Sequence, residues 1–106
     1  EVVPDPTKRD VDAGFWSRAD AYISLANSHC DTVQAGKVSA SLLFAASRFN
    51  AFIVASNSSS AEFLSEAREE ALDYFTEQFR SMLAENLDDH IKNFAKYTAD
   101  ERQLDA

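Results

Sequence analysis

No proline follows Pro6 in this chain of 106 residues, and its only glycines are Gly14 and Gly36. Because proline and glycine are the residues that most disfavour helix interiors, long helices can form almost anywhere beyond the first residues. Residues 1–11 hold both prolines and no apolar period, which predicts a flexible N-terminal arm. The sequence therefore favours an all-α fold, with one helical domain over residues 12–97 and a frayed tail over residues 98–106.

The first predicted helix begins after Asp12 and ends near Gly36. Asp12 is a typical N-cap residue, and Gly36 is placed to end the helix in a left-handed conformation. Apolar side chains recur at helical spacing between these residues and predict one buried face: Phe15, Trp16, Ala19, Tyr22, Ile23, Ala26, Cys30 and Val33. The other side of this helix is polar, so we expect it to pack on one side only.

The second predicted helix, over residues 38–56, is apolar on nearly every side. One stripe is expected to face the core of the domain: Val38, Leu42, Ala45, Ala46, Phe49, Phe52 and Ile53. The opposite side carries Leu43, Phe44 and Val54 among small residues. A helix that is apolar all round is usually buried all round, so this opposite side needs a cover.

Arg48 and Asn50 argue against a membrane span in the same segment. A span needs about 20 apolar residues, and these two polar side chains would lie near its middle. In a soluble domain, Arg48 must reach water at the rim or find a carboxylate, because an unpaired buried ion is costly. Candidate carboxylates are those of Asp20, Asp73 and Glu77. Asn50 lies at the rim as well, or it sets the register of a helix pair. We expect no membrane partner.

The third predicted helix begins at a capping box of Ser59 and Glu62 and runs to about residue 97. Its apolar face contains Leu64, Ala67, Ala71, Phe75, Phe79, Leu83, Leu87 and Ile91, with Met82 and Phe94 alongside. From Ala71 to Ile91 the step is four residues, so the face drifts by about 40° per step and its halves meet different neighbours. Either this segment is broken near residues 84–86 or it is one long helix. The lack of glycine and proline favours the long helix.

A helix of about 36 residues is roughly 54 Å long, whereas helices of about 20 residues reach roughly 30 Å. The two shorter helices cannot both lie beside the third and cover all of it. Its far end and the spare side of the second helix then remain exposed, and a twofold-symmetric homodimer would cover both. The interface candidates are Leu43, Phe44, Ser47, Arg48, Asn50, Ala51, Val54, Leu87, Ile91 and Phe94. A helical hairpin packed on a long third helix, in a dimer, is the predicted architecture.

Three segments carry a family resemblance: residues 15–21 (FWSRADA), residues 38–52 (VSASLLFAASRFNAF), and residues 74–79 (YFTEQF) with residues 85–89 (ENLDD). In these segments the chain resembles a family of uncharacterised bacterial proteins catalogued as domain of unknown function 3144. The resemblance covers roughly residues 15 to 95. It implies a bacterial α-helical domain, and it carries over no activity, cofactor or site residue.

The net charge of −8 argues against nucleic acid as a partner, because that affinity comes mostly from basic side chains that neutralise phosphates. One cysteine, Cys30, excludes an internal disulfide and fits a reducing, cytoplasmic location. The first ten residues contain no apolar run of signal-peptide length, although a segment removed before residue 1 would leave no trace.

Acidic side chains form a ridge along the third predicted helix, within about 100° of one another. The members of this acidic ridge are Glu62, Glu66, Glu69, Glu70, Asp73 and Glu77. Such a ridge is typical of a solvated helix face, and a basic protein surface or a divalent cation is its alternative use. The chain lacks the Glu-x-x-His pattern of metal sites in helical bundles, and adjacent side chains such as His29 and Cys30 diverge on a helix. We expect no metal and no cofactor.

These patterns indicate no catalytic residue, and two glycines cannot build a glycine-rich phosphate loop. We therefore expect a non-enzymatic, homodimeric protein-interaction module. The alternative is a small-molecule or metal-binding protein, enzymes included, with a pocket between its helices near Trp16, Arg48 and residues 86–90.

Overall fold

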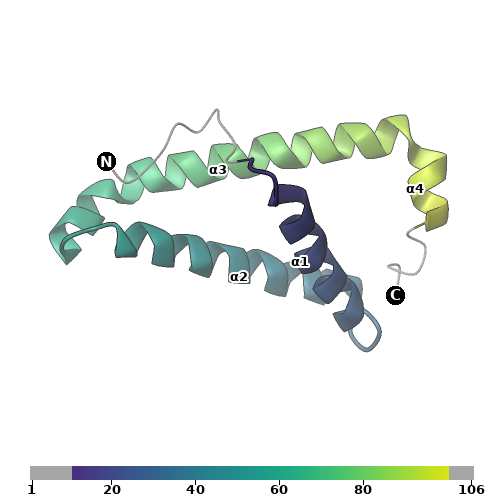
Figure 1. Cartoon of the computed structure of the whole chain (residues 1–106), viewed down its shortest axis with the longest axis horizontal. Coiled ribbons are helices and arrows are strands. Elements are labelled where there is room, and N and C mark those ends of the chain that lie inside the picture. The colour runs from purple at the N-terminus through teal and green to yellow at the C-terminus, as the bar shows by residue number, and fades with distance from the viewer. Residues whose placement is uncertain (1–10, 101–106) are drawn as a thin grey trace. The chain divides into compact units, whose positions relative to one another are not determined.

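The computed structural model describes residues 11–100, and the side chains of residues 11–97. The described part consists of the helices α1 (Phe15–His29), α2 (Ala35–Ser56), α3 (Ala61–Lys92) and α4 (Phe94–Asp100), and it contains no strand (Figure 1). The all-α prediction with three main helices is confirmed. The predicted arm up to residue 10 and the tail beyond residue 100 lie outside the described residues.

The described residues form two compact units, and α2 contributes to both. One unit comprises residues 47–92, in which the second half of α2 and α3 form an antiparallel hairpin (Figure 1). The other comprises residues 11–46 and 93–100, which contain α1, the first half of α2 and α4.

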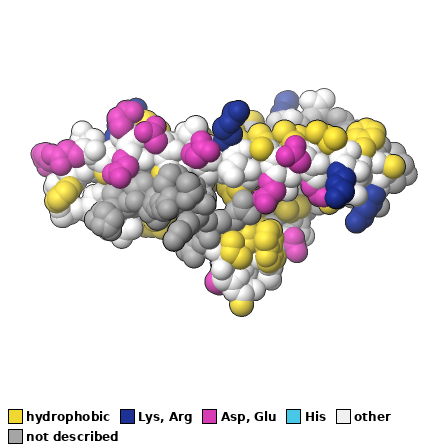
Figure 2. Space-filling view, turned by 90° about the horizontal axis from the view of Figure 1, so that it is seen from above, with side chains coloured by type: hydrophobic (Ala, Val, Ile, Leu, Met, Phe, Trp, Pro, Cys, Tyr) yellow, Lys and Arg dark blue, Asp and Glu magenta, His cyan; other side chains and the backbone are white. Residues whose placement is uncertain are grey.

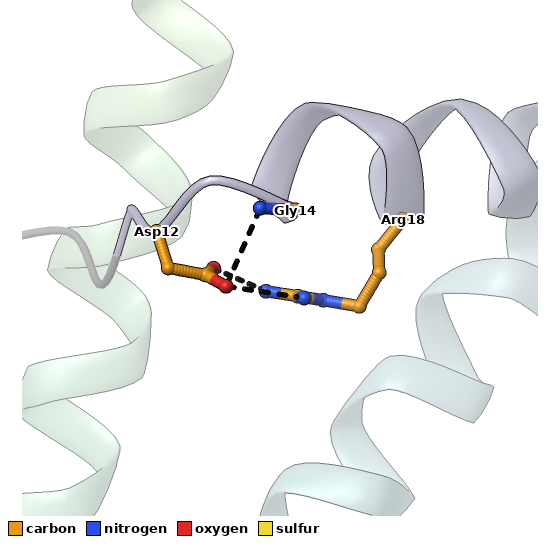
Figure 3. Close-up of polar contacts among 3 residues, drawn as sticks. All are labelled: Asp12, Gly14 and Arg18. Carbon is orange, nitrogen blue, oxygen red and sulfur yellow. Dashed lines mark hydrogen bonds and ion pairs between the residues drawn. The ribbon is translucent and has the colours of Figure 1, made fainter.

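Asp12 stabilises the start of α1, although it is not the N-cap residue. The N-cap position belongs to Gly14, whose backbone N–H donates to Oδ2 of Asp12 over 3.4 Å. The carboxylate of Asp12 also forms an ion pair with Arg18, with 2.6 Å between Nη2 and Oδ1 (Figure 3). These contacts lower the pKa of Asp12, chiefly through the hydrogen bond from Arg18. Asp12 therefore anchors the first turn from two residues before the cap.

The turn between α1 and α2 comes earlier than the sequence predicts. α1 ends at His29, and its C-cap residue Cys30 has an ordinary right-handed conformation, with φ of −69°. Gly36 lies in the first turn of α2 and does not adopt a positive φ. The prediction that Gly36 ends the first helix is therefore wrong. The carbonyl of Gln34 accepts hydrogen bonds from the backbone N–H groups of Lys37 and Val38. The hydrogen bonds of α2 thus begin before Gly36, which leaves no helix end at Gly36 to cap.

The serine cluster between α2 and α3 ends one helix and begins the next. The hydroxyl of Ser58 donates to the carbonyl of Val54 at 2.9 Å and closes the last turn of α2. Oγ of Ser60 accepts a hydrogen bond from the backbone N–H of Phe63 at 3.1 Å, which is the side-chain contact of an N-cap residue. The N-cap residue is therefore Ser60 rather than Ser59. The third residue after Ser60 is Phe63, so Glu62 is not placed to complete the predicted capping box. Glu62 still lies in the first turn, where a negative charge is favourable.

α3 continues without interruption through residues 84–86, as the long-helix prediction requires. Its 32 residues correspond to a length of about 48 Å. The helix ends at Lys92 rather than at residue 97, and α4 follows after Asn93. Near this end the side-chain amide of Asn86 donates to the carbonyl of Met82 at 2.9 Å. Nδ1 of His90 lies 2.8 Å from the carbonyl of Asn86, to which it can only donate.

Few side chains of the described residues are buried. Val38 is buried in one unit, and Val54 and Tyr74 are buried in the other. The predicted face of α1 is half-buried at Phe15, Ala19, Ala26 and Cys30, whereas its larger members Trp16, Tyr22 and Ile23 are exposed. Most of the predicted core stripe of α2 is also exposed, including Phe49 and Phe52. A helix pair covers only one side of each helix, and this explains why so many apolar side chains face water.

Candidate functional site

α2 exposes large apolar side chains on more than one side. Every residue from Ser39 to Phe49 is exposed, and the large apolar members of the helix that face water are Leu42, Leu43, Phe44, Phe49, Phe52 and Ile53. Of the interface candidates that the sequence predicts on this helix, Leu43, Phe44, Ser47, Arg48 and Ala51 are exposed and Asn50 is half-buried. These residues form a surface that the described part of their own units leaves open.

Val54 differs from the other interface candidates on α2. Its side chain is only 5% exposed, and it lies in the same unit as the buried Tyr74. Val54 therefore belongs to the core of the hairpin, and we no longer count it as a surface for a partner. The second half of α2 packs with α3 in one unit, and a side chain as buried as that of Val54 takes part in this packing.

α3 has two apolar faces. The first is buried or half-buried and consists of Leu64, Ala67, Ala71, Tyr74, Phe75 and Met82. The second consists of Phe79, Leu83, Leu87 and Ile91, whose side chains are between 44% and 73% exposed, and we call it the exposed stripe. At about 100° per residue the centres of the two faces lie roughly 140° apart. The drift that the four-residue step predicts thus carries the apolar face from the packed side of α3 to water.

The predicted far end of the third helix is divided between two elements. Leu87 and Ile91 belong to α3 and are exposed as predicted. Phe94 is also exposed, but it lies in α4 beyond Asn93. The exposed stripe therefore ends at Ile91.

Charge is unevenly distributed along α3. All six members of the acidic ridge are exposed. Residues 61–77 carry six acidic and one basic side chain, a net charge of −5, whereas residues 78–92 carry three acidic and two basic side chains, a net charge of −1. Figure 2 shows the carboxylates gathered over the amino-terminal part of α3 and hydrophobic side chains along its carboxy-terminal part. The ion pair between Arg68 and Glu69, at 2.7 Å, is exposed and therefore contributes little to stability.

Among residues 11–97 of the structure, the ion pair that a buried Arg48 would require is not formed. The side chain of Arg48 is exposed, and within its own unit it pairs with neither Asp73 nor Glu77. An exposed guanidinium keeps its hydration, so no carboxylate is needed. The structure thus agrees with the alternative in which Arg48 lies at the rim.

α2 meets the length and composition requirements of a membrane-crossing helix. It has 22 residues, its most apolar 18-residue window has a mean hydropathy of 1.5, and 11% of that window is buried. Core helices of soluble proteins meet the same requirements, but they are mostly buried. By length and composition alone, α2 suits either a protein partner or the interior of a bilayer.

The described residues hold no group of three or more His, Cys, Asp and Glu side chains arranged to bind a metal ion. Cys30 is a half-buried free thiol at the end of α1, and His90 bonds to the backbone within α3.

A family model described as protein of unknown function (DUF3144) matches residues 15–91. The matched range includes α1, α2 and all but the last residue of α3, and therefore both the apolar surface of α2 and the exposed stripe. Comparisons with curated proteins and with solved structures found no match for the chain.

Proposed function

The chain belongs to the DUF3144 family of proteins of unknown function, and we propose that it acts as a non-enzymatic, homodimeric protein-interaction module. The observation that carries this proposal is the exposure of large apolar side chains on α2 and α3. The acidic ridge stays solvated in such a dimer, where it could recruit a basic protein surface. We place the module in the cytoplasm, where a single free thiol stays reduced.

The exposed apolar surface is large enough to support association. Full burial of a Leu, Ile or Phe side chain is worth about 1.5–3 kcal/mol. Five side chains on α2 (Leu42, Leu43, Phe44, Phe49 and Phe52) and the four of the exposed stripe are roughly half exposed on average. Covering these nine would then contribute roughly 7–14 kcal/mol per copy. Two copies together exceed the cost of association, which is about 4–15 kcal/mol plus side-chain ordering.

Insertion energies favour a protein partner over lipid as the cover of α2. The eight Leu, Ile, Phe and Val residues of α2 contribute roughly −2.4 to −4.8 kcal/mol in a bilayer. Arg48 alone costs about 2.5–3.5 kcal/mol near the centre of a span, and Asn50 and the serines of the helix oppose insertion further. The summed free energy of inserting α2 into a bilayer is therefore close to zero or unfavourable. At a protein interface, by contrast, Arg48 can keep its contact with water at the rim.

Light scattering of the purified full chain between about 1 and 100 μM tests the proposal, and we expect a mass of twice 11.8 kDa. Leu87→Glu places a charge on the exposed stripe of α3 and should yield monomers. Leu25→Glu is the matched control, because Leu25 is equally exposed on α1 and lies outside the proposed contact. A wild-type monomer at every concentration would refute the proposal. A monomer whose melting temperature rises with a metal ion or small molecule would support the ligand-binding alternative.

A further inference from the structure

We propose that two copies of the chain pair antiparallel through the exposed stripe of α3, with the twofold axis level with residue 85 along the helix. This inference rests on the proposed homodimer, and it specifies where the copies meet and in which orientation. Phe79, Leu83, Leu87 and Ile91 all lie in the unit of residues 47–92, on the side of α3 that is turned away from its packed face. The contact therefore needs no rearrangement of the hairpin.

The four-residue spacing of the stripe determines how two copies fit together. Side chains at such intervals form a ridge along the helix, and two ridges of this kind interdigitate at a crossing angle of about −50°. The ridge directions coincide at this angle, so the drift of the stripe does not carry its ends out of contact. Leu83 and Leu87 lie two residues to either side of Glu85, and Phe79 and Ile91 lie six residues to either side. An antiparallel pair thus places Leu83 on Leu87 of the second copy, and Phe79 on Ile91.

Charge decides between the antiparallel and the parallel orientation. Parallel pairing would lay the two halves with a net charge of −5 side by side, and like charges in proximity oppose association. Antiparallel pairing overlaps residues 78–92 of both copies, so the two acidic ridges point away from each other. It also brings Arg80 of each copy close to Asp88 of the other, since both lie on one flank of the stripe, five residues before and three after Glu85. Both side chains are exposed and accessible in the isolated chain.

Disulfide trapping tests this geometry in the full chain. In a Cys30→Ala background, we would prepare one variant with Leu83→Cys and a second with Leu87→Cys. Each is oxidised alone and as an equal mixture. A disulfide needs Cα atoms about 4.4–6.8 Å apart, so antiparallel pairing predicts a covalent dimer in the mixture and little in either variant alone. Efficient crosslinking of each variant alone would show a parallel pair and overturn the proposal. The matched control is Ser81→Cys mixed with Leu87→Cys, because Ser81 lies on the other side of α3, and it should give no covalent dimer.

Light scattering of the same samples under reducing conditions separates this inference from the proposed function. Dimers that give no covalent product in the mixture would overturn the α3 pairing and leave the homodimer standing. Monomers would overturn both. Circular dichroism verifies that the variants retain their helices.

A charge exchange gives a second readout that requires no cysteine. Arg80→Asp and Asp88→Arg should each weaken dimerisation by roughly 2- to 30-fold, since each pair occurs twice in the dimer. The double variant should recover most of the affinity. Failure to recover, with helicity retained, would exclude this orientation.

Discussion

Val54→Ala should destabilise the individual chain, although the amino-acid pattern places Val54 among the interface residues. The side chain is 5% exposed, so nearly all of its transfer free energy is lost on truncation. Removal of two methyl groups, at about 0.8 kcal/mol each, gives roughly 1.6 kcal/mol, and the cavity that the truncation leaves raises the loss to about 2 kcal/mol. For a domain of this size each kcal/mol lowers the melting temperature by about 4–8 °C. We therefore expect a decrease of roughly 8–16 °C.

Differential scanning calorimetry at one fixed protein concentration measures this change. The concentration must match between variants, because association makes the melting temperature depend on it. Val11→Ala is the control: the same two methyl groups are removed from a side chain that is 48% exposed and lies before α1, so the loss should stay below about 1 kcal/mol. Equal effects of the two substitutions would refute the packing of Val54 in the hairpin. A Val54→Ala variant that melts like the wild type but no longer dimerises would return Val54 to the interface.

Three further substitutions probe the helix ends and the proposed contact. Ser60→Ala should lower the free energy of unfolding by about 1 kcal/mol in urea titrations, because Ser60 caps α3, whereas Ser59→Ala should have almost no effect; the reverse order would restore the capping box at Ser59. Because Arg18 lowers the pKa of Asp12, the contribution of this pair to stability is present above the unfolded-state pKa and is lost as the pH falls through the lower folded-state pKa. NMR titration should find the Asp12 carboxyl ionising below the usual range, and Arg18→Gln should move its pKa back up; an unchanged midpoint would contradict the contact. Leu87→Ala should weaken the dimer by roughly 15- to 200-fold in sedimentation equilibrium, because about half of a leucine is uncovered in each copy, and an unchanged dissociation constant would count against the exposed stripe.

The helical character of the chain and the continuity of α3 through residues 84–86 follow from the sequence alone. No proline or glycine lies between residues 61 and 92, so no residue of α3 lacks a backbone donor or favours a break, and α3 does run unbroken through residues 84–86. The four-residue step from Ala71 to Ile91 likewise predicts a drifting face. In the structure that face turns from the half-buried Ala71 and Phe75 to the exposed Leu87 and Ile91.

The residues at which the helices begin and end, and the side of α2 that is buried, could be identified only from the tertiary structure. Three consecutive serines offer equivalent caps in the sequence, and local hydrogen bonding selects Ser60 for α3 while Ser58 closes α2. Gly36 permits a left-handed cap, but the first helix already ends at His29. Gly36 therefore lies within α2 and has no positive φ. A helix that is apolar all round gives no periodic signal for the side its neighbour covers. The side of α2 that packs on α3 is decided by the tertiary structure. Val54 is buried there, whereas Phe49 and Phe52 are exposed to water.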